Sequence, residues 1–236
     1  MMVGTSRKAS VSRAGQAVPP VVYAENCTIP WVEATELIMR VLLFCDVHND
    51  MEALRHLARR EADWYICAGD LVSWGRGLEA CGEILKPLGK RLLVIPGNHE
   101  HASDIEAFAG HFGFQPVHGR NRDLDGVRFS FLGHSNPTPF HTPGEDTEEE
   151  LAQHLKALRE PPPDVLVCHC PPHGTALDQM RNGHHAGSTA IRSFVDEVQP
   201  AWFFSGHIHE TEGLTVRIGK TSAHNPGKRG FLLELP

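Results

Sequence analysis

An apolar run, Val41-Leu42-Leu43-Phe44-Cys45, ends in the polar cluster Asp46-Val47-His48. Short apolar runs rich in β-branched and aromatic residues are typical of buried strands. Other polar clusters follow other apolar runs in the same way: Gly69-Asp70, Gly97-Asn98-His99-Glu100, His169, Gly206-His207-Ile208-His209 and, more weakly, Asn225-Pro226-Gly227. Because open sheets bind ligands at the carboxyl ends of their strands, we expect these clusters to converge on one rim of a sheet.

Four of the polar residues have the spacing of metal ligands. Asp46 and His48 lie two residues apart, and His207 and His209 repeat that spacing. On a strand, residues two apart point the same way, so each pair would bind one cation. Carboxylate oxygen combined with imidazole nitrogen suits Mn, Fe, Zn, Co or Ni better than Mg or Ca, which prefer oxygen ligands alone. The spacing therefore predicts a transition-metal site.

Asp70 and Asn98 complete the predicted ligand chemistry. A carboxylate has two oxygens, so Asp70 is expected to bridge two ions about 4 Å apart, while Asn98 would supply a neutral carbonyl oxygen. Taken alone, an Asp or Asn after a strand is as readily a turn former or a helix cap. That explanation would have to hold independently in five clusters, so we favour a site for two metals.

Composition limits the domain count and the partners. A chain of 236 residues with 41% hydrophobic residues is long enough for one domain with a well-buried core. A formal charge of -7 offers no general attraction to nucleic acid or to an anionic membrane. No run approaches the ~20 apolar residues of a membrane span. We expect a single cytoplasmic domain without nucleic-acid or membrane partners, and the sequence leaves its oligomeric state open.

The cysteines show no C-x-x-C pair, and several lie inside apolar strand runs. A thiol in such a place packs as a small hydrophobic side chain. In Cys168-His169-Cys170, alternation along a strand would direct both thiols away from His169. We interpret the cysteines as reduced and structural, which fits a cytoplasmic chain.

Residues 1–38 differ from the rest of the chain. They lack clear periodicity, and Arg7, Lys8 and Arg13 have no apolar stretch behind them, which argues against a secretory signal. Two interpretations stay open: a disordered arm, or a reading frame extended upstream of a true start at Met39. Either interpretation places the folded domain at residues 39–236.

From Met39 onward, strand and helix patterns alternate. Helices are predicted over residues 49–60, 77–85 and 103–112, from Thr147 to before Pro161, and from Ser188 onward. Thr147 and Glu150 fit a capping box, and Ser188 fits an N-cap. Residues 213–236 are predicted to form three short strands.

In this order and spacing, the clusters resemble the calcineurin-like metallophosphoesterase superfamily. Its pattern of D-x-H, G-D, G-N-H-D/E, a lone His and G-H-x-H is matched by every cluster from Asp46 to His209. Three further stretches are similar to a subgroup of small prokaryotic stand-alone phosphoesterases: Ser135–Phe140, His173-Gly174-Thr175 with Asp178, and His185–Arg192. The resemblance implies an α/β fold, a two-sheet mixed β sandwich flanked by helices, with a dinuclear site on the loops at one edge.

The resemblance also implies a role for each matched residue. One metal would be held by Asp46, His48, Asp70 and His209, and the other by Asp70, Asn98, His169 and His207. His99 matches the family's catalytic histidine, which contacts the substrate phosphate rather than a metal.

Three positions depart from the common pattern. Asn49-Asp50 stands where many members have Gly, so the loop under the first metal is expected to differ in shape. Leu71-Val72-Ser73-Trp74-Gly75 replaces the Asp-Arg-Gly continuation of the Ser/Thr protein phosphatases, which disfavours a phosphoprotein substrate. Glu100 supports no inference.

The implied activity is a dinuclear-metal-dependent phosphoric ester hydrolase that uses a metal-bridging hydroxide on a small phosphomonoester or phosphodiester. His99 would donate a hydrogen bond to the phosphate or protonate the leaving oxygen. A nuclease of the same superfamily is an alternative, and it should show a basic track. A non-catalytic scaffold on the same fold should lack metal ligands. The sequence leaves open the choice between monoester and diester, the physiological substrate and the metal.

Substrate contacts are predicted for Asn98, His99, His173, His185 and Ser188. The two loop histidines, His173 and His185, are as readily solvated side chains. Ser188 opens a helix whose free N–H groups suit an anion, but helix capping alone explains it. The loop from residue 134 to 146 is either a lid or a plain connector.

Overall fold

The computed structural model describes residues 38–236. The expectations for residues 1–37, including the N-terminal arm and Cys27, lie outside the described residues. The strands are β1 (Met39–Phe44), β2 (Trp64–Ala68), β3 (Leu92–Ile95), β4 (Gln115–Pro116), β5 (Arg120–Leu124), β6 (Val127–Leu132), β7 (Val165–Cys168), β8 (Trp202–Phe204), β9 (Thr215–Ile218), β10 (Thr221–His224) and β11 (Phe231–Leu235). The helices are α1 (Met51–Arg59), α2 (Leu78–Leu85), α3 (Ala102–Phe112), α4 (Glu148–Leu158) and α5 (Thr189–Val198), with short 3-10 segments η1 (Lys86–Arg91), η2 (His209–Thr211) and η3 (Gly227–Arg229).

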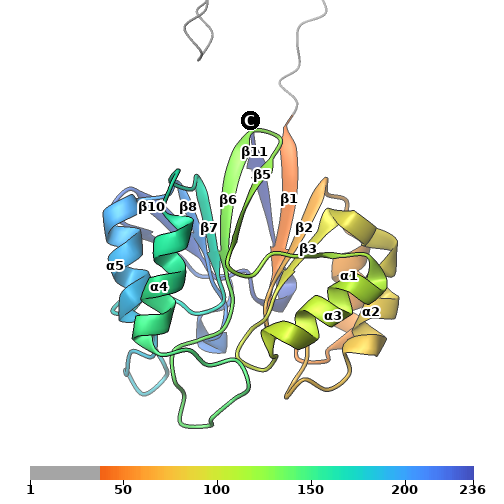
Figure 1. Cartoon of the computed structure of the whole chain (residues 1–236), viewed down its shortest axis with the longest axis horizontal. Coiled ribbons are helices and arrows are strands. Elements are labelled where there is room, and N and C mark those ends of the chain that lie inside the picture. The colour runs from red at the N-terminus through yellow and green to blue at the C-terminus, as the bar shows by residue number, and fades with distance from the viewer. Residues whose placement is uncertain (1–37) are drawn as a thin grey trace, which may run out of the picture. The chain divides into compact units, whose positions relative to one another are not determined.

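Two mixed sheets form the centre of the fold (Figure 1). Their strand orders are β11-β1-β2-β3-β4 and β5-β6-β7-β8-β10-β9. In β1, Val41 and Leu43 are buried between the two sheets, whereas Leu42 and Phe44 are buried on the helix side. Successive strand residues point to opposite faces. A strand covered on both faces therefore needs the uninterrupted apolar run that the sequence contains.

Helices cover the outer face of each sheet (Figure 1). Leu54 and Leu57 of α1 pack with residues of α2 and α3 on the first sheet. Leu151 of α4 and Ile191 of α5 pack on the second. This arrangement confirms the predicted α/β fold, a two-sheet mixed β sandwich flanked by helices. Within residues 38–236, no helix is both long and apolar enough to cross a membrane.

Local signals start the helices where the sequence predicts. Asp50 caps α1 by accepting a hydrogen bond from the Ala53 N–H at 3.0 Å. The predicted capping box at α4 is complete, because Thr147 Oγ1 accepts from the Glu150 N–H and Glu150 Oε2 accepts from the Thr147 N–H. α1, α2 and α3 begin and end within one or two residues of their predicted bounds. The three tail strands β9, β10 and β11 are also present.

The carboxyl ends of the parallel strands carry the polar clusters to one rim. β1, β2 and β3 run parallel in the first sheet, as do β6, β7 and β8 in the second. Backbone hydrogen bonds tie the emerging loops together, with the Asp46 N–H donating to Gly69 O and the Gly206 N–H donating to His169 O. The predicted convergence is therefore confirmed.

The described cysteines all pack as free, buried thiols: Cys45, Cys67, Cys81, Cys168 and Cys170. Cys168 and Cys170 lie in the core beneath α4 and α5. His169 lies between them in sequence but turns to the opposite side, toward Ala68 of the first sheet. The structural role predicted for these cysteines is confirmed.

Candidate metal centre

The candidate ligands lie in loops just beyond the strand ends, and not on the strands. β1 ends at Phe44, and both Asp46 (φ 54°) and His48 (φ 46°) adopt the left-handed backbone conformation. Asp70 (φ 51°) and His207 (φ 69°) do the same. Strand alternation was therefore the wrong reason for expecting Asp46 and His48 to point together, and the same expectation was wrong for His207 and His209, which lie in different ligand groups. Left-handed residues other than glycine are uncommon and cluster at functional sites, where the surrounding structure holds them.

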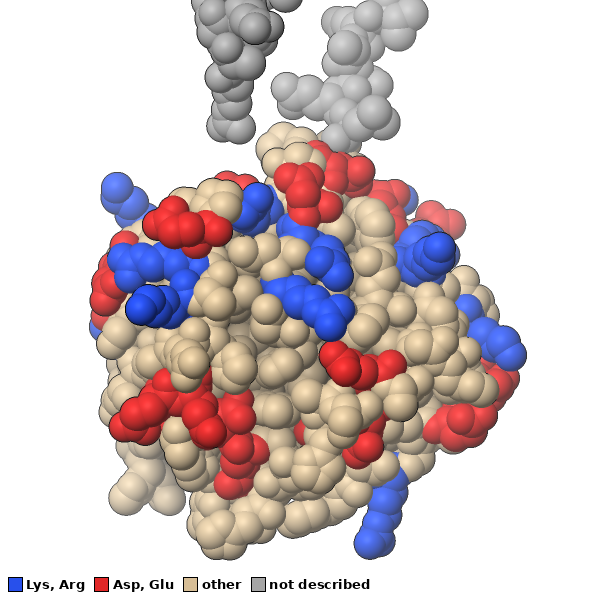
Figure 2. Space-filling view, in the orientation of Figure 1, with Lys and Arg blue, Asp and Glu red and all other residues tan. Residues whose placement is uncertain are grey.

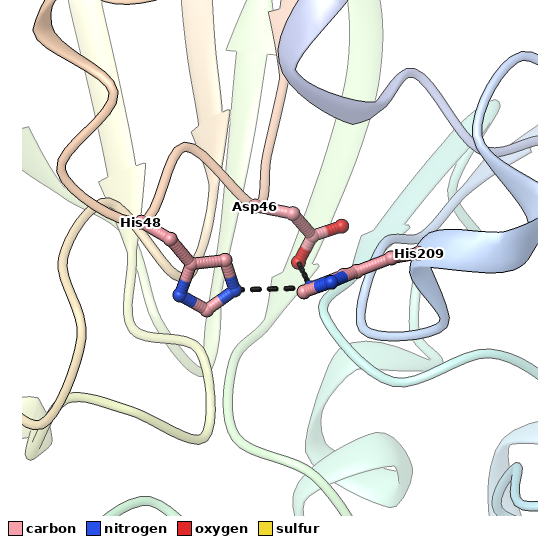
Figure 3. Close-up of side chains that lie close together, drawn as sticks. All are labelled: Asp46, His48 and His209. Carbon is pink, nitrogen blue, oxygen red and sulfur yellow. Dashed lines mark hydrogen bonds and ion pairs between the residues drawn. The ribbon is translucent and has the colours of Figure 1, made fainter.

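The first group consists of Asp46, His48 and His209, whose ligand atoms all lie within 4.8 Å of one another (Figure 3). His48 Nε2 lies 3.0 Å from His209 Nε2. His209 Nε2 lies 3.9 Å from Asp46 Oδ1. Two imidazole nitrogens and a carboxylate oxygen converging in this way form a donor set that suits a transition-metal ion.

The second group consists of Asp70, His169 and His207, again within 4.8 Å. Asn98 Oδ1 lies among them, 3.0 Å from His169 Nε2 and 2.8 Å from His207 Nδ1. His169 Nδ1 donates to the Ala68 carbonyl at 2.9 Å, which fixes the ring and leaves Nε2 to act as a ligand atom. The group is buried apart from His207, which is partly exposed.

Asp70 joins the two groups through a single oxygen. Its Oδ2 lies 3.5 Å from His48 Nε2 and 3.4 Å from His169 Nε2. Its Oδ1 accepts a hydrogen bond from the His99 N–H at 2.9 Å. The sequence pattern predicted that both oxygens would face metals. In the structure only Oδ2 lies between the two groups, because Oδ1 is used by the backbone.

Burial and the neighbouring charged side chains set the pKa values of Asp70 and His169. Burial alone would raise the pKa of Asp70, but the imidazoles of His169 and His48 lower it more, so the pKa lies below its ordinary range. Burial alone would lower the pKa of His169, but the Asp70 carboxylate raises it to about 9. The Asp70 carboxylate is thus an anion that stabilises the protonated His169 ring. A metal cation would compete with the proton on His169 for the same site.

A cavity of about 540 Å³ opens beside the first group, with Asp46, His48, His99, His209, Ser73 and Lys228 among the residues that line it. The sequence matches the family described as calcineurin-like phosphoesterase over residues 39–211. The chain belongs to the calcineurin-like phosphoesterase family.

One relative and two solved structures are similar to this chain. The uncharacterised protein MJ1162 of Methanocaldococcus jannaschii is 28% identical over 205 residues, which cover 83% of this chain and 91% of the relative. Among solved structures, TT1561 of Thermus thermophilus aligns with a TM-score of 0.63 at 17% identity, covering 80% of this chain and 89% of that one. The phosphopantetheinyl hydrolase of Mycobacterium tuberculosis aligns with a TM-score of 0.59 at 13% identity, covering 79% and 88%. Identities this low show a shared fold.

The predicted catalytic residue of this calcineurin-like phosphoesterase, His99, lies beside the first ligand group. Its Nδ1 accepts a hydrogen bond from the Trp74 N–H at 3.2 Å, so the neutral ring carries its proton on Nε2. The His99 ring meets the His48 ring edge to face, with centroids 4.9 Å apart. The ligand atoms of His48, Asp70 and His99 also lie within 4.8 Å of one another. Distance is therefore compatible with either a metal or a phosphate contact for His99.

Glu100 organises the two loops that carry Asp70 and Asn98, a role that sequence reasoning missed. Its buried carboxylate accepts hydrogen bonds from the Asp70 N–H at 3.1 Å, the Gly97 N–H at 2.8 Å and the Val72 N–H at 2.9 Å. Burial and the nearby Asp70 carboxylate raise the pKa of Glu100 to about 8. An acidic residue inside a cluster of candidate ligands was the available signal.

Two further residues fix the ligands from a distance. Thr142 Oγ1 accepts from Asn98 Nδ2 at 3.0 Å, which turns Asn98 Oδ1 toward the histidines. The loop from residue 134 to 146 therefore positions a ligand, whichever of the two predicted roles it has. Asn225, in the weakest cluster, donates to Ile208 O at 3.1 Å and Thr211 Oγ1 at 2.9 Å. Asn225 thus supports the loop of His209.

Two glycines allow ligand loops from different strands to pack closely against each other. A Cβ on Gly206 would lie 2.5 Å from Asp46 Oδ2. A Cβ on Gly97 would collide with Asp70 Oδ1. The Gly that precedes His207, and the Gly that precedes Asn98, are therefore needed for contact between ligand loops of different strands.

The departure at Asn49 also has a structural explanation. Asn49 adopts φ 64°, a conformation that Gly and Asn tolerate best. Its side chain accepts from the Ser73 N–H at 2.9 Å and donates to Arg76 O at 2.8 Å. The loop of the first ligand group is thereby tied to the turn that carries Trp74, a link that Gly could not provide.

His173 and His185, both predicted to contact substrate, are held by a carboxylate outside the two ligand groups. His185 Nδ1 lies 2.7 Å from Asp178 Oδ1, and His173 Nδ1 lies 3.6 Å from Asp178 Oδ2. Asp178 also accepts backbone N–H groups from Gly174 and Gly187. Both histidines are thus anchored to a buried carboxylate, and neither lines the cavity beside the first group.

The expectation of free N–H groups at Ser188 was wrong. Ser188 is buried, and its Oγ accepts from the Ile191 N–H and donates to Glu148 Oε2 at 2.8 Å. The Thr189 and Ala190 N–H groups also donate to the Glu148 carboxylate. A carboxylate of the protein itself therefore occupies the helix end that an anionic substrate would need.

Proposed function

We propose that this calcineurin-like phosphoesterase is a dinuclear-metal-dependent hydrolase of a small phosphomonoester or phosphodiester. The observation that carries the proposal is the position of Asp70 Oδ2, within 3.5 Å of His48 Nε2 and 3.4 Å of His169 Nε2. One anionic oxygen shared by two groups of nitrogen and oxygen donors fits a pair of ions. Asp46, His48, Asp70 and His209 would hold one ion, and Asp70, Asn98, His169 and His207 would hold the other.

The donor set favours Mn, Fe, Zn, Co or Ni, because it contains several imidazole nitrogens, whereas Mg and Ca prefer oxygen ligands. When bound, two such ions lower the pKa of a water nucleophile and offset charge on the phosphoryl oxygens. His99 would donate a hydrogen bond from its Nε2–H to the phosphate or to the leaving oxygen, since its Nδ1 accepts from the Trp74 N–H. The Trp74 N–H thereby orients the donor before substrate arrives.

Two alternatives are less well supported. A nuclease should present a continuous basic track. On the face seen in Figure 2, Lys and Arg side chains alternate with Asp and Glu, and the chain carries a formal charge of -7. A scaffold has no need of metal ligands, whereas every expected ligand is present here.

The free thiols of the described residues agree with the predicted cytoplasmic location.

The test is a panel of phosphate esters assayed with Mn, Co, Ni, Zn and Mg, together with elemental analysis. Wild-type protein should hold about two transition-metal ions and hydrolyse at least one ester. Asp70→Asn should lose both the ions and the activity, because both groups share Asp70 Oδ2. Asp196→Asn, on the exposed side of α5, is the matched control and should retain both. Wild-type protein without metal and without Mn-stimulated hydrolysis would rule out the proposal.

A further inference from the structure

Trp74 is a large aromatic side chain left half exposed beside the proposed catalytic residue. It lies in the turn between β2 and α2, and 50% of it is exposed. Its ring centroid lies 5.5 Å from that of His99, with an interplanar angle of 89°. In an edge-to-face pair His99 covers at most one face of the indole, and half of the side chain is open to solvent.

Backbone contacts hold Trp74 in a conformation that a bulky residue seldom adopts. Its φ of 53° lies in the left-handed region, an outlier for such a side chain. The Trp74 N–H is bound by His99 Nδ1 at 3.2 Å, and the neighbouring Ser73 N–H is bound by Asn49 Oδ1 at 2.9 Å. Asn49 Nδ2 closes the turn through Arg76 O at 2.8 Å. These contacts fix the direction in which the side chain leaves the backbone, and the edge-to-face contact with His99 orients the ring.

The same turn forms part of the cavity wall at the ligand groups. Ser73 lines that cavity together with His48 and His99, and Ser73 Oγ lies 3.2 Å from His48 Nδ1. A phosphate ester whose leaving oxygen reaches His99 Nε2 must extend its leaving group past His99. Trp74 does not line the cavity itself, but its ring adjoins His99 and it follows Ser73, so it lies within reach of such a leaving group.

We propose that the open face of Trp74 stacks on a planar aromatic ring in the leaving group, so that the substrates are aryl or nucleoside phosphate esters. This inference rests on the proposed function. An indole fixed before binding loses little conformational freedom when a flat ring stacks on it, and such stacking tolerates many ring types. An aliphatic leaving group gains no comparable contact.

The experiment compares Trp74→Ala, Trp74→Phe and wild type on three esters: p-nitrophenyl phosphate, a nucleoside phosphate ester and glycerol phosphate. For each ester, kcat/KM of the variant is divided by that of wild type, which cancels the intrinsic reactivity of the leaving group. Ala and Phe both keep a Cβ, so the backbone strain at φ 53° is unchanged. Ile38→Ala is the matched control, because Ile38 is 57% exposed and precedes β1, at the opposite end of that strand from Asp46.

Trp74→Ala should lower kcat/KM by about five- to a hundred-fold for at least one ring-bearing ester and by less than about two-fold for glycerol phosphate. Whichever ring-bearing ester loses more identifies an aryl or a nucleoside group. Trp74→Phe should keep most of the activity, and Ile38→Ala should behave as wild type. AMP should quench tryptophan fluorescence in wild type, and this quenching should be lost in Trp74→Phe.

Equal losses on all three esters, or no loss on either ring-bearing ester, would overturn the inference and leave the proposed hydrolase intact. Unchanged AMP quenching in Trp74→Phe would also overturn it. A wild-type protein that hydrolyses none of the three esters with any metal would overturn the proposed function and this inference together.

Discussion

The two carboxylate oxygens of Asp70 have different roles. Oδ1 accepts the His99 N–H, and Oδ2 faces His48 and His169. One side chain therefore positions the proposed catalytic residue and joins both ligand groups. This division explains why a change at Asp70 is expected to affect metal content, activity and the His99 loop at once.

His99→Ala separates the phosphate role from a metal role. If His99 contacts phosphate alone, the variant should keep about two metal ions while kcat falls by roughly two to three orders of magnitude, the range expected for a lost hydrogen-bond donor to the developing charge. Elemental analysis and steady-state kinetics on the same preparation give both quantities. Loss of one ion per chain in His99→Ala would show that His99 is a metal ligand.

His118 predicts a pH dependence of stability. Burial, reinforced by nearby His134 and His154, lowers the pKa of His118 to about 4. The unfolded chain, with a His pKa near 6.5, then binds more protons between about pH 4 and 6.5. The free energy of unfolding therefore falls as the pH drops through this window, by up to about 3 kcal/mol from His118 alone.

The variant His118→Asn tests this dependence by urea denaturation at pH 7.5 and pH 4.5. Asn keeps an acceptor for the Gly133 N–H, which His118 Nδ1 binds at 2.9 Å, but it cannot take up a proton. The variant should lose less free energy of unfolding on acidification than wild type does. Equal losses in the two proteins would contradict the assignment, because the titration of all other groups is common to both.

At the scale of elements, α4 and α5 are joined by one carboxylate. Glu148, in the first turn of α4, accepts from Ser188 Oγ at 2.8 Å and from the Thr189 and Ala190 N–H groups at the start of α5. An anion at a helix N-terminus is favourable, and here a neighbouring helix provides it. The same contact excludes a substrate anion from that end of α5.

Glu148→Gln should destabilise the fold by about 1–3 kcal/mol, because an amide group would face backbone N–H donors and leave one unsatisfied. Glu149→Gln is the matched control, since Glu149 occupies the same helix turn but is exposed. Both variants remove one negative charge from the start of α4, so their difference isolates the bridge to α5. Equal free energies of unfolding for the two variants, measured in urea, would contradict this account.

At the scale of the whole molecule, the candidate metal centre exists only where the two sheets meet. Asp46, Asp70 and Asn98 follow β1, β2 and β3 of the first sheet, whereas His169 and the pair His207 and His209 follow β7 and β8 of the second. Neither sheet alone supplies a full donor set for either ion. Folding of the complete sandwich is thus a precondition for metal binding.

A chain that begins at Met39 should fold and act as the full chain does. Met39 is buried and already pairs with Leu235 at the end of β11. The strand pairing of the first sheet therefore already begins at that residue. The melting temperature should stay within a few degrees, and hydrolysis of the same ester should proceed at a similar rate. Aggregation or loss of activity on truncation would show that residues 1–38 contribute to the domain.

The sequence by itself determined the strands that precede the polar clusters, the three tail strands, the helix starts and the identity of the converging residues, but it did not predict β4, β5 or β6. Each of these depends on local chemistry: an apolar run between polar loops, a capping box at Thr147 and Glu150, or a ligand type at a strand end. The family pattern adds their order. These features do not depend on which segments of the chain pack together, because each involves residues that are close in sequence.

Only the tertiary structure decided how the ligands are held. Glu100 binds the Asp70 N–H 30 residues away, and Thr142 orients Asn98 44 residues away. Glu148 fills the end of α5 from 40 residues away at Ser188. No local pattern encodes these pairings, because a hydrogen-bond partner at that distance is set by how two sheets and their helices pack. For the same reason, the left-handed loops and the single shared oxygen of Asp70 became visible only in the folded chain.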